Sequence, residues 1–462
     1  MINKSKCKEP IKILDKEERH SSFKEVEFTL TDESAVNESL RCLNCKNSPC
    51  ISGCPVGINI PKFINYISQG LTREAYKVIC ESNFLPSICG RVCPQEKQCE
   101  AKCVKGKIGE PVAIGRLEKY IADKMMFFPK RGKVLPSKNK KVAVIGSGPS
   151  GLTCAGELGH KGYKVDIFEA LHTPGGVLAY GIPSFRLPKD VLEFEIKELE
   201  KIGVRIFTNI VIGKTLSIDD LFDKGYNAIY IATGAGLPKF MGIPGEGLAG
   251  VYSANEFLTR INLMKAYDSK FDTPTKLPKK IVIIGGGNVA IDAARCAVRL
   301  GAEKVSVIYR RGESDMPARK EEISHAKEEG VEFIFFKSPI EFIGENGILK
   351  SVKCVSMEHK GEDQLGKKLF VPLYDEKLDL ETDMAIIAIG NKVNRLLVES
   401  EADLKFDKDG KIIADKSTAR TSRKYVYAGG DAVTGAATVI LAMEAGKRAA
   451  HQIDEDLSDD SL

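Results

Sequence analysis

The stretch that decides the fold is Lys141–Ala170, KVAVIGSGPSGLTCAGELGHKGYKVDIFEA. A short apolar strand leads into the glycine motif GSGPSG, a helix follows, and a second strand, Lys164–Phe168, ends in an acid. In such a unit the first glycine makes a tight turn, the second lets the backbone approach a pyrophosphate, and the third lets the helix pack on the strand. The phosphates lie at the helix N-terminus, and the acid accepts from the ribose hydroxyls. The predicted dinucleotide contacts are Gly146, Gly148, Pro149, Ser150 and Glu169.

Two later stretches indicate that this dinucleotide is FAD. Ala228–Gly234, AIYIATG, reads as a strand that ends in a small turn. Tyr425–Asp431, YVYAGGD, is a strand followed by a helical pattern. Its aspartate is positioned to hold the flavin ribityl chain, and the positive end of the following helix would face the flavin ring. The predicted contacts are Gly234, Gly430, Asp431, Thr438 and Val439.

A second fingerprint occupies Lys280–Arg311, KIVIIGGGNVAIDAARCAVRLGAEKVSVIYRR. Its second strand ends in two arginines instead of an acid. An acid there would hold the 2′-hydroxyl of NAD, whereas arginines fit a 2′-phosphate, so we predict NADP(H). The alternative is that both arginines are surface residues at a strand end. The predicted contacts are Gly285, Gly287, Asn288, Val289, Ala290, Arg310 and Arg311.

Cysteine usage sets the N-terminal region apart, because ten of the 13 cysteines lie at or before Cys103. RCLNCKNSPCISGC has C-x2-C-x4-C-x3-C spacing, and CGRVCPQEKQCEAKC has C-x3-C-x5-C-x3-C spacing. Tetrahedral thiolate sites suit zinc or iron–sulfur clusters. Cys54 and Cys93 each precede a proline, as at the end of ferredoxin cysteine runs. We predict two [4Fe–4S] clusters, with structural zinc as the alternative.

The remaining cysteines give no redox-active pair. Cys154, Cys296 and Cys354 are isolated, without C-x2-C or C-x4-C spacing. A flavoprotein with two dinucleotide sites but no dithiol needs another exit for its electrons, and the cysteine-rich region supplies one.

Composition is that of a globular protein, with 43% hydrophobic and 28% charged residues among 462. The net charge of +5 is spread along the chain and does not favour nucleic-acid binding. The N-terminus lacks the apolar region of a signal peptide, and the longest apolar runs are too short to span a bilayer. We expect a cytoplasmic protein without membrane association, in which clustered cysteines are ligands.

The predicted fold class is α/β, with an α-helical iron–sulfur domain followed by two Rossmann-like domains, one inserted in the other. Residues 1–135 form the helical domain, with helices over Ile60–Asn83. The FAD domain takes 136–255 and 380–462, and the NADP(H) domain takes 256–379. The acidic tail Asp454–Leu462 is predicted to be disordered.

Several of these stretches resemble the small (β) subunit of glutamate synthase. They are RCLNCKNSPCISGCPVGINIP, PGGVLAYGIPSFRLPKD and GGDAVTGAATVILAMEAGK. The likeness extends over roughly residues 25–452. These stretches equally resemble the N-terminal half of dihydropyrimidine dehydrogenase, which shares the same module. The likeness is greatest for a clostridial-type branch that contains the large subunit of an electron-bifurcating NADH-dependent reduced ferredoxin:NADP+ oxidoreductase.

In that family, cluster ligation is crossed between the two cysteine runs. The resemblance implies that one cluster is held by Cys42, Cys45, Cys50 and Cys103, and the other by Cys54, Cys93, Cys99 and a non-cysteine ligand. The matching stretch IGRLE makes Glu118 the candidate for that ligand. Alternatively, Cys89 is the ligand and Glu118 is a surface residue paired with a lysine.

The resemblance also adds Gly176 and Arg186 as flavin contacts, with a surface cation as the alternative for Arg186. Val211 and Gly390 complete the predicted cofactor contacts. No catalytic residue is predicted, because the cofactors carry the chemistry and the protein orients them.

The resulting hypothesis is an NADP(H)-dependent FAD/iron–sulfur oxidoreductase subunit that passes electrons to a partner. In a bifurcating complex the partner would be a ferredoxin–NADP reductase-like flavin/[2Fe–2S] protein, with ferredoxin as a further partner. The alternative is a glutamate synthase β subunit that feeds a glutaminase-bearing large subunit. A third possibility is a non-enzymatic docking module that carries zinc.

Overall fold

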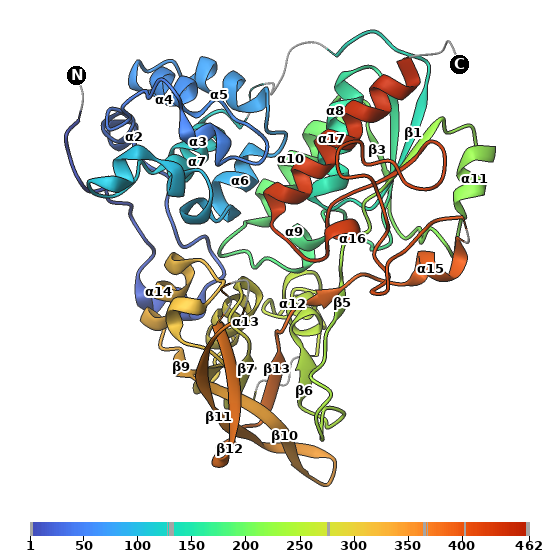
Figure 1. Ribbon diagram of the computed structural model, residues 1–462. Helices are drawn as coiled ribbons and strands as arrows, with labels where there is room; N and C mark the ends of the chain where they lie inside the picture. The colour runs from blue at the N-terminus through green and yellow to red at the C-terminus, as the bar shows by residue number, and fades with distance from the viewer. Residues whose placement is uncertain are drawn as a thin grey trace.

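The computed structural model describes residues 3–126, 128, 134–274, 278–363, 366, 368–401 and 403–458. An N-terminal helical unit lies beside one α/β unit, and a second α/β unit extends away from both (Figure 1). Within the described ranges, no helix is both long enough and apolar enough to cross a membrane. Residues 129–133, at the end of the predicted helical domain, lie outside the described residues.

The N-terminal unit is built from short helices around the cysteine loops. They are α1 (Lys16–Ser21), α2 (Asp32–Ser39), α3 (Pro49–Ser52), α4 (Ile60–Ser68), α5 (Thr72–Cys80), α6 (Pro86–Val92) and α7 (Ile114–Lys124), with 3-10 turns at Gln95–Lys97, Glu100–Lys102 and Val104–Lys107. The helices predicted within Ile60–Asn83 are confirmed as α4 and α5. Phe63, Ile64 and Ile67 are buried as their helical spacing requires, and Cys80 is fully buried.

The first α/β unit has a parallel sheet in the order β15-β4-β1-β2-β3. Its strands are β1 (Lys141–Ile145), β2 (Lys164–Phe168), β3 (Arg205–Phe207), β4 (Ala228–Ile231) and β15 (Val426–Ala428). One face packs on α8 (Pro149–His160), α10 (Lys189–Lys201) and α17 (Val439–Ser458) in a core shared with the N-terminal helices. The other face packs on α11 (Ile218–Asp223) and α15 (Leu396–Ser400). The helical unit is thus anchored to the helix layer that carries the first glycine motif.

The second α/β unit has a parallel sheet in the order β6-β13-β7-β8-β9. Its strands are β6 (Val251–Ser253), β7 (Lys280–Ile284), β8 (Lys304–Tyr309), β9 (Glu332–Phe335) and β13 (Met384–Ile387). The helices α12 (Ala254–Asn262), α13 (Asn288–Arg299) and α14 (Lys320–Glu328) belong to the core on one face. An antiparallel sheet of β10 (Lys337–Glu345), β11 (Ile348–Glu362) and β12 (Lys368–Glu381) covers the other face.

Strand pairing moves the boundaries of the inserted domain. β6 and β13 both pair within the second sheet, so this unit extends beyond the predicted 256–379 at both ends. A two-stranded ribbon of β5 (Leu237–Pro238) and β14 (Asn391–Lys392) joins the two units. The tail prediction was wrong for 454–458, which continue α17, because Lys138 and Lys161 both pair with Asp454.

Candidate functional site

The first glycine motif forms an open cradle at the start of α8. Gly146 has φ +101°, and a Cβ there would lie 2.5 Å from the Ala232 carbonyl oxygen, so the turn requires glycine. At Gly148, by contrast, a Cβ would have no neighbour within 4 Å. The space beside the N-terminus of α8 is therefore open, as a bound pyrophosphate requires.

Three other segments meet over this cradle. A Cβ at Gly176 would lie 2.9 Å from Gly148 Cα, and one at Gly430 would lie 3.0 Å from Ser150 Cβ. The structure therefore brings the predicted contacts from three distant parts of the sequence to one place. Gly234, which follows β4 with φ +70°, ends the neighbouring strand of the same sheet.

Glu169 closes the cradle at the end of β2. Its carboxylate accepts hydrogen bonds from Ser147 N at 2.9 Å and from Leu171 N at 2.9 Å. Its carbonyl oxygen accepts from Ile210 N at 3.0 Å, which sets Val211 next to this strand end. Glu169 is only 6% exposed, so the ribose contact predicted for it would have to be made by the small exposed part of its carboxylate.

The start of α17 carries a polar group in need of a partner. Thr438 directly precedes the helix, and its Oγ1 is buried without a hydrogen-bond partner among the described residues. Asp431 lies nearby and accepts from Ala437 N at 3.2 Å, and burial raises its pKa to about 6. An unpaired hydroxyl beside a helix N-terminus fits a bound group with acceptor atoms.

Tyr180 belongs to the same region, although the sequence arguments did not single it out. Burial raises its pKa to about 12, and the charges of Asp431 and Glu169 add to the rise. The ring therefore lies near both acids that were predicted to hold the dinucleotide. The sequence feature that could have indicated Tyr180 is its position in the stretch PGGVLAYGIP, which also contains Gly176.

The second glycine motif repeats this design at β7 and α13. Gly285 has φ +143°, and a Cβ there would lie 2.4 Å from the Ala388 carbonyl oxygen. At Gly287 a Cβ would again meet nothing within 4 Å. Asn288 Oδ1 accepts from Arg319 N at 2.9 Å, while Val289 is 39% exposed and Ala290 is buried in the core. Gly390, just past β13, also faces open space.

The two arginines predicted to select NADP(H) follow β8 beside this motif. The ring of Tyr309 lies against Gly286, where a Cβ would approach it to 2.6 Å. Arg310, next in sequence, is exposed, and Arg311 is half-buried over the ring of Phe370 at 5.8 Å. Neither guanidinium forms an ion pair with an acid in the part of the chain described, so both are available to an anionic ligand.

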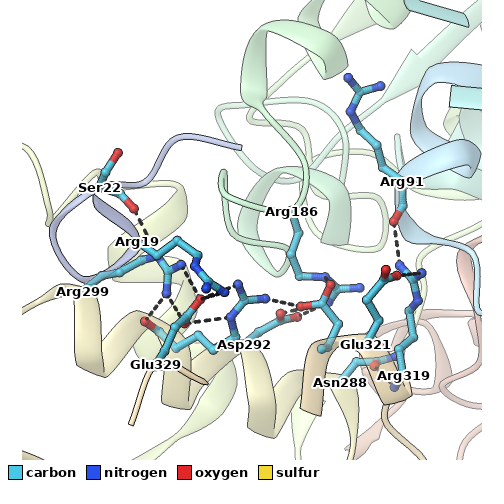
Figure 2. Close-up of polar contacts among 12 residues, drawn as sticks. Arg19, Ser22, Arg91, Arg186, Asn288, Asp292, Arg299, Arg319, Glu321 and Glu329 are labelled. Carbon is cyan, nitrogen blue, oxygen red and sulfur yellow. Dashed lines mark hydrogen bonds and ion pairs between the residues drawn. The ribbon is translucent and has the colours of Figure 1, made fainter. Parts of the chain in front are cut away.

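The structure gives Arg186 two carboxylate partners on the second α/β unit. Its Nη1 lies 2.7 Å from Asp292 Oδ2, and its Nε lies 3.3 Å from Glu322 Oε1 (Figure 2). The guanidinium is 5% exposed, so it is not the surface cation that was weighed as an alternative. These pairs tie the FAD domain to α13 and α14.

Arg319 links the second α/β unit to the N-terminal helical unit (Figure 2). Its backbone N–H donates to Asn288 of the glycine motif, and its Nη1 donates to the Arg91 carbonyl oxygen at 2.9 Å. Lys97 Nζ, two residues before Cys99, donates to the Pro317 carbonyl oxygen at 2.7 Å. The segment Pro317–Arg319 therefore connects the second dinucleotide loop to the cysteine-bearing unit, which the sequence patterns did not indicate.

In the N-terminal unit, the two cysteine runs pack against each other. A Cβ at Gly53 would lie 2.7 Å from the Gln98 carbonyl oxygen and 3.0 Å from Cys99 Cα. This close approach brings the loop around Cys54 onto the loop around Cys99. The described cysteines are all free thiols.

The first group of thiols consists of Cys42, Cys45, Cys50 and Cys103, all half-buried. Burial raises the pKa of Cys50 to about 11, and the nearby Cys42 and Cys103 add to the rise. Burial likewise raises the pKa of Cys42, with Cys103 and Cys45 contributing. Four thiolates this close would repel one another unless a cationic iron–sulfur core held them, so the donor set fits such a group.

The second group consists of Cys54, Cys93, Cys99 and Glu118. Burial raises the pKa of Cys54 to about 11, and the charges of Glu118 and Cys93 contribute. Burial also raises the pKa of Cys99, with Glu118, Cys54 and Cys93 among its charged neighbours. These four side chains therefore lie near one another, and the buried Cys89 lies in the same group.

Glu118 is buried on α7 and has no lysine partner among the described residues. Its carboxylate is 6% exposed, burial raises its pKa to about 7, and Asn83 Nδ2 donates to its Oε1 at 2.7 Å. Asn83 Oδ1 accepts from Leu85 N at 2.9 Å, which fixes the amide orientation. The surface ion pair weighed for Glu118 is therefore wrong. Cys89, the other candidate ligand, is also buried here.

Across the described ranges, no three His, Cys, Asp or Glu side chains converge closely enough to hold one metal ion. Zinc requires its ligand atoms at about 2.0–2.3 Å from one centre.

Comparison with known proteins agrees with this division. Residues 19–128 match the family described as dihydropyrimidine dehydrogenase domain II, 4Fe–4S cluster, and residues 140–446 match the pyridine nucleotide-disulphide oxidoreductases. The fold resembles FprA from Mycobacterium tuberculosis, with a TM-score of 0.59 and 20% identity over 71% of this chain and 86% of that one. The chain is thus an oxidoreductase with an iron–sulfur domain and two dinucleotide-binding domains.

Curated relatives narrow the class. The glutamate synthase small chain of Azospirillum brasilense is 35% identical over 94% of this chain and 92% of its own length. The β subunit of NADP(+)-dependent formate dehydrogenase from Moorella thermoacetica is 36% identical over 88% of this chain, but only 60% of that protein is covered. The chain therefore belongs to the family of flavin and iron–sulfur oxidoreductases that includes the glutamate synthase small chain. FAD, NADP(H) and 4Fe–4S clusters, the predicted cofactors, are those of this family.

Proposed function

We propose that this chain is the NADP(H)-linked electron-transfer subunit of a larger complex, with two [4Fe–4S] clusters. One observation carries the proposal: the cysteines form two groups at different depths. Cys93, Cys99 and Glu118 are buried and Cys54 is half-exposed, while Cys42, Cys45, Cys50 and Cys103 are all half-exposed. Cys89, which precedes Cys93 on α6, meets Met443 of α17 in the FAD domain at 3.4 Å.

This arrangement gives each part of the chain a task. When bound, FAD, NADP(H) and the clusters supply hydride and one-electron chemistry. Gly148 and Gly287 leave room for the two pyrophosphates, and Thr438 and Asp431 offer polar contacts at the start of α17. Arg310 and Arg311 supply the positive charge that favours a 2′-phosphate.

We assign Cys42, Cys45, Cys50 and Cys103 to the outer cluster, and Cys54, Cys93, Cys99 and Glu118 to the inner one. The mutual proximity of the members of each set supports the assignment. The hydrogen bond from Asn83 supports Glu118, because it orients the carboxylate from one oxygen and leaves the other for iron.

Iron and acid-labile sulfide analysis tests the two-cluster proposal. Protein purified without oxygen should carry about eight iron and about eight sulfide per chain, and Glu118→Ala should lose about half of each. Glu110→Ala, which changes an acid of the same unit outside both sets, should lose none. Stoichiometric zinc in place of iron would contradict the proposal.

The glutamate synthase small chain and the formate dehydrogenase β subunit are each, by name, one chain of a larger enzyme, which supports a partner for this chain. For the partner, we propose a ferredoxin–NADP reductase-like flavoprotein with which this chain forms an electron-bifurcating complex. The alternative, a glutamate synthase, is supported by the 35% identity to a glutamate synthase small chain. It predicts the same cofactors for this chain.

A further inference from the structure

Phe185 is a side chain of the first α/β unit that is buried in the core of the second. Its neighbours in the sequence, Ile182 and Leu187, pack in the core that α8, α10 and α17 share. Phe185 itself is 1% exposed and packs with α12, α13 and α14, across the domain boundary. The short segment between α9 (Val177–Tyr180) and α10 therefore inserts one aromatic ring into the NADP(H)-binding unit.

Two cations and a second aromatic ring contact Phe185. The guanidinium carbons of Arg295 and Arg299, both on α13, lie 4.6 Å and 4.0 Å from the centre of the Phe185 ring. The centre of the Phe23 ring lies 6.1 Å from it, and Phe23 stacks in turn on Tyr267 at 4.2 Å. An arginine over an aromatic face is attracted to it, and more strongly where water is excluded. Phe185 is therefore held by α13 and by the N-terminal unit at once.

The segment of residues 22–26, which we call the brace, binds to both α/β units. On the side of the first unit, Val26 N donates to the Phe185 carbonyl oxygen at 3.0 Å. On the side of the second unit, Arg299 Nε donates to the Ser22 carbonyl oxygen at 3.1 Å (Figure 2). The brace thus ties the N-terminal unit to both sides of the contact that Phe185 makes.

A rotation of the second α/β unit about the β5–β14 ribbon would have to break these contacts. Two units joined by a narrow connection are expected to move relative to each other unless their interface is large and apolar. Here a rotation would expose the buried Phe185 ring. It would also separate the Arg186 guanidinium, which is 5% exposed, from Asp292 at 2.7 Å. Breaking a buried ion pair is strongly unfavourable, so the contacts oppose such a rotation.

We propose that Phe185 is a positioning residue that, with Arg186 and the brace, holds the NADP(H)-binding unit in one orientation against the FAD-binding unit, with or without nucleotide. The two dinucleotide sites would then be aligned without a domain swing. Hydride transfer needs its reacting atoms about 3–3.5 Å apart, and a small misplacement costs much of the rate. Neither the clusters nor the partner subunit enters this inference, which rests on the use of FAD and NADP(H) by this chain.

The first experiment measures whether Phe185 becomes accessible to solvent in the wild-type holoenzyme. Hydroxyl-radical footprinting is carried out without nucleotide and with saturating NADP+, and the oxidation of each side chain is measured by mass spectrometry. We expect Phe185 to stay unmodified in both states, whereas Phe240, which is 52% exposed, is modified in both. Modification of Phe185 in either state would show that the unit swings, and would overturn the inference.

The second experiment separates positioning from binding. Phe185→Ala should lower the limiting rate of flavin reduction by NADPH in anaerobic rapid mixing by about tenfold or more. Its dissociation constant for NADP+ should change little, because the predicted nucleotide contacts lie within the second unit. Phe342→Ala removes a ring that is 3% exposed from β10 of the same unit, on the other face of its sheet. This control should leave the rate and the dissociation constant at their wild-type values.

An unchanged limiting rate in Phe185→Ala, or an equal fall in Phe342→Ala, would overturn the inference. A wild-type flavin that NADPH does not reduce would instead contradict the proposed function, and the footprint would still decide between a fixed and a swinging unit. If Phe185→Ala does not fold, Phe185→Leu, which keeps an apolar side chain without the ring, gives the same comparison.

Discussion

At the scale of single residues, the two arginines after β8 are expected to select the nicotinamide cofactor. Each charge-assisted hydrogen bond is worth about 1.5–3 kcal/mol, or roughly tenfold to a hundredfold in affinity. Arg310→Ala and Arg311→Ala should therefore weaken NADPH binding by about that factor. NADH lacks the 2′-phosphate, so its affinity should change little. Equilibrium reduction of the flavin by each nucleotide without oxygen measures both effects.

Lys304→Ala provides the matched control, because this lysine is an exposed cation at the opposite end of β8. It should leave both nucleotides unaffected. Equal losses for NADPH and NADH in Arg310→Ala and Arg311→Ala would show that the arginines do not read the 2′-phosphate.

At the scale of elements, α13 is held to the segment after α14 by a buried ion-pair cluster. Glu329 accepts from both Arg295 and Arg299, at 2.7 Å and 2.6 Å, and all three side chains are 0% exposed. Removing one partner of a buried pair leaves charge uncompensated and costs about 3–5 kcal/mol. We therefore expect Glu329→Gln to lower the urea midpoint at pH 7.

The same cluster gives a pH dependence whose sign follows from the pKa of Glu329. Burial opposes ionisation, but hydrogen bonds from Arg299 and Arg295 prevail and lower its pKa to about 2. A carboxyl whose folded pKa is depressed stabilises the fold above its unfolded pKa, near 4.5, and loses that contribution as pH falls toward 2. The gap in urea midpoint between wild type and Glu329→Gln should narrow from pH 6 to pH 3.

Glu303→Gln removes an exposed acid from the pair with Lys279 and should match the wild type at each pH. A gap that stays constant with pH would mean that Glu329 is not ionised in the folded protein.

At the scale of the whole molecule, the depth of the two cysteine groups predicts where a partner binds. Leu43, next to Cys42 in the sequence, is 42% exposed and therefore marks the surface beside the half-exposed cysteines. Anaerobic affinity purification from the source cells, followed by mass spectrometry, should recover a ferredoxin–NADP reductase-like flavoprotein. Recovery of a glutaminase-bearing large subunit would instead make the chain part of a glutamate synthase.

Leu43→Glu separates partner binding from cluster assembly in this experiment. The variant should retain its iron and its flavin but recover less of the partner, because a buried charge at the interface is unfavourable. Full recovery would move the partner site away from the half-exposed cysteines.

Local patterns in the sequence determined the elements around both glycine motifs. Gly146 and Gly285 indicate their turns in the sequence because only a residue without a Cβ fits there. The arginines after β8 indicate the cofactor because a positive charge stands where an acid is expected. The types of metal ligand could also be predicted from the sequence, because cysteines at short spacing are typical of metal and iron–sulfur sites. Such signals depend on a few neighbouring residues and need no knowledge of packing.

Tertiary structure alone decided what lies between the domains. That Arg186 pairs with Asp292, that Arg319 touches the Arg91 carbonyl, and that Cys89 meets Met443 depends on contacts between residues more than a hundred positions apart. No local pattern encodes such contacts, because they arise from how separately formed units bury their remaining polar and apolar surfaces. The same reason explains β6 and β13: a strand of three or four residues acquires its sheet only from the strand beside it.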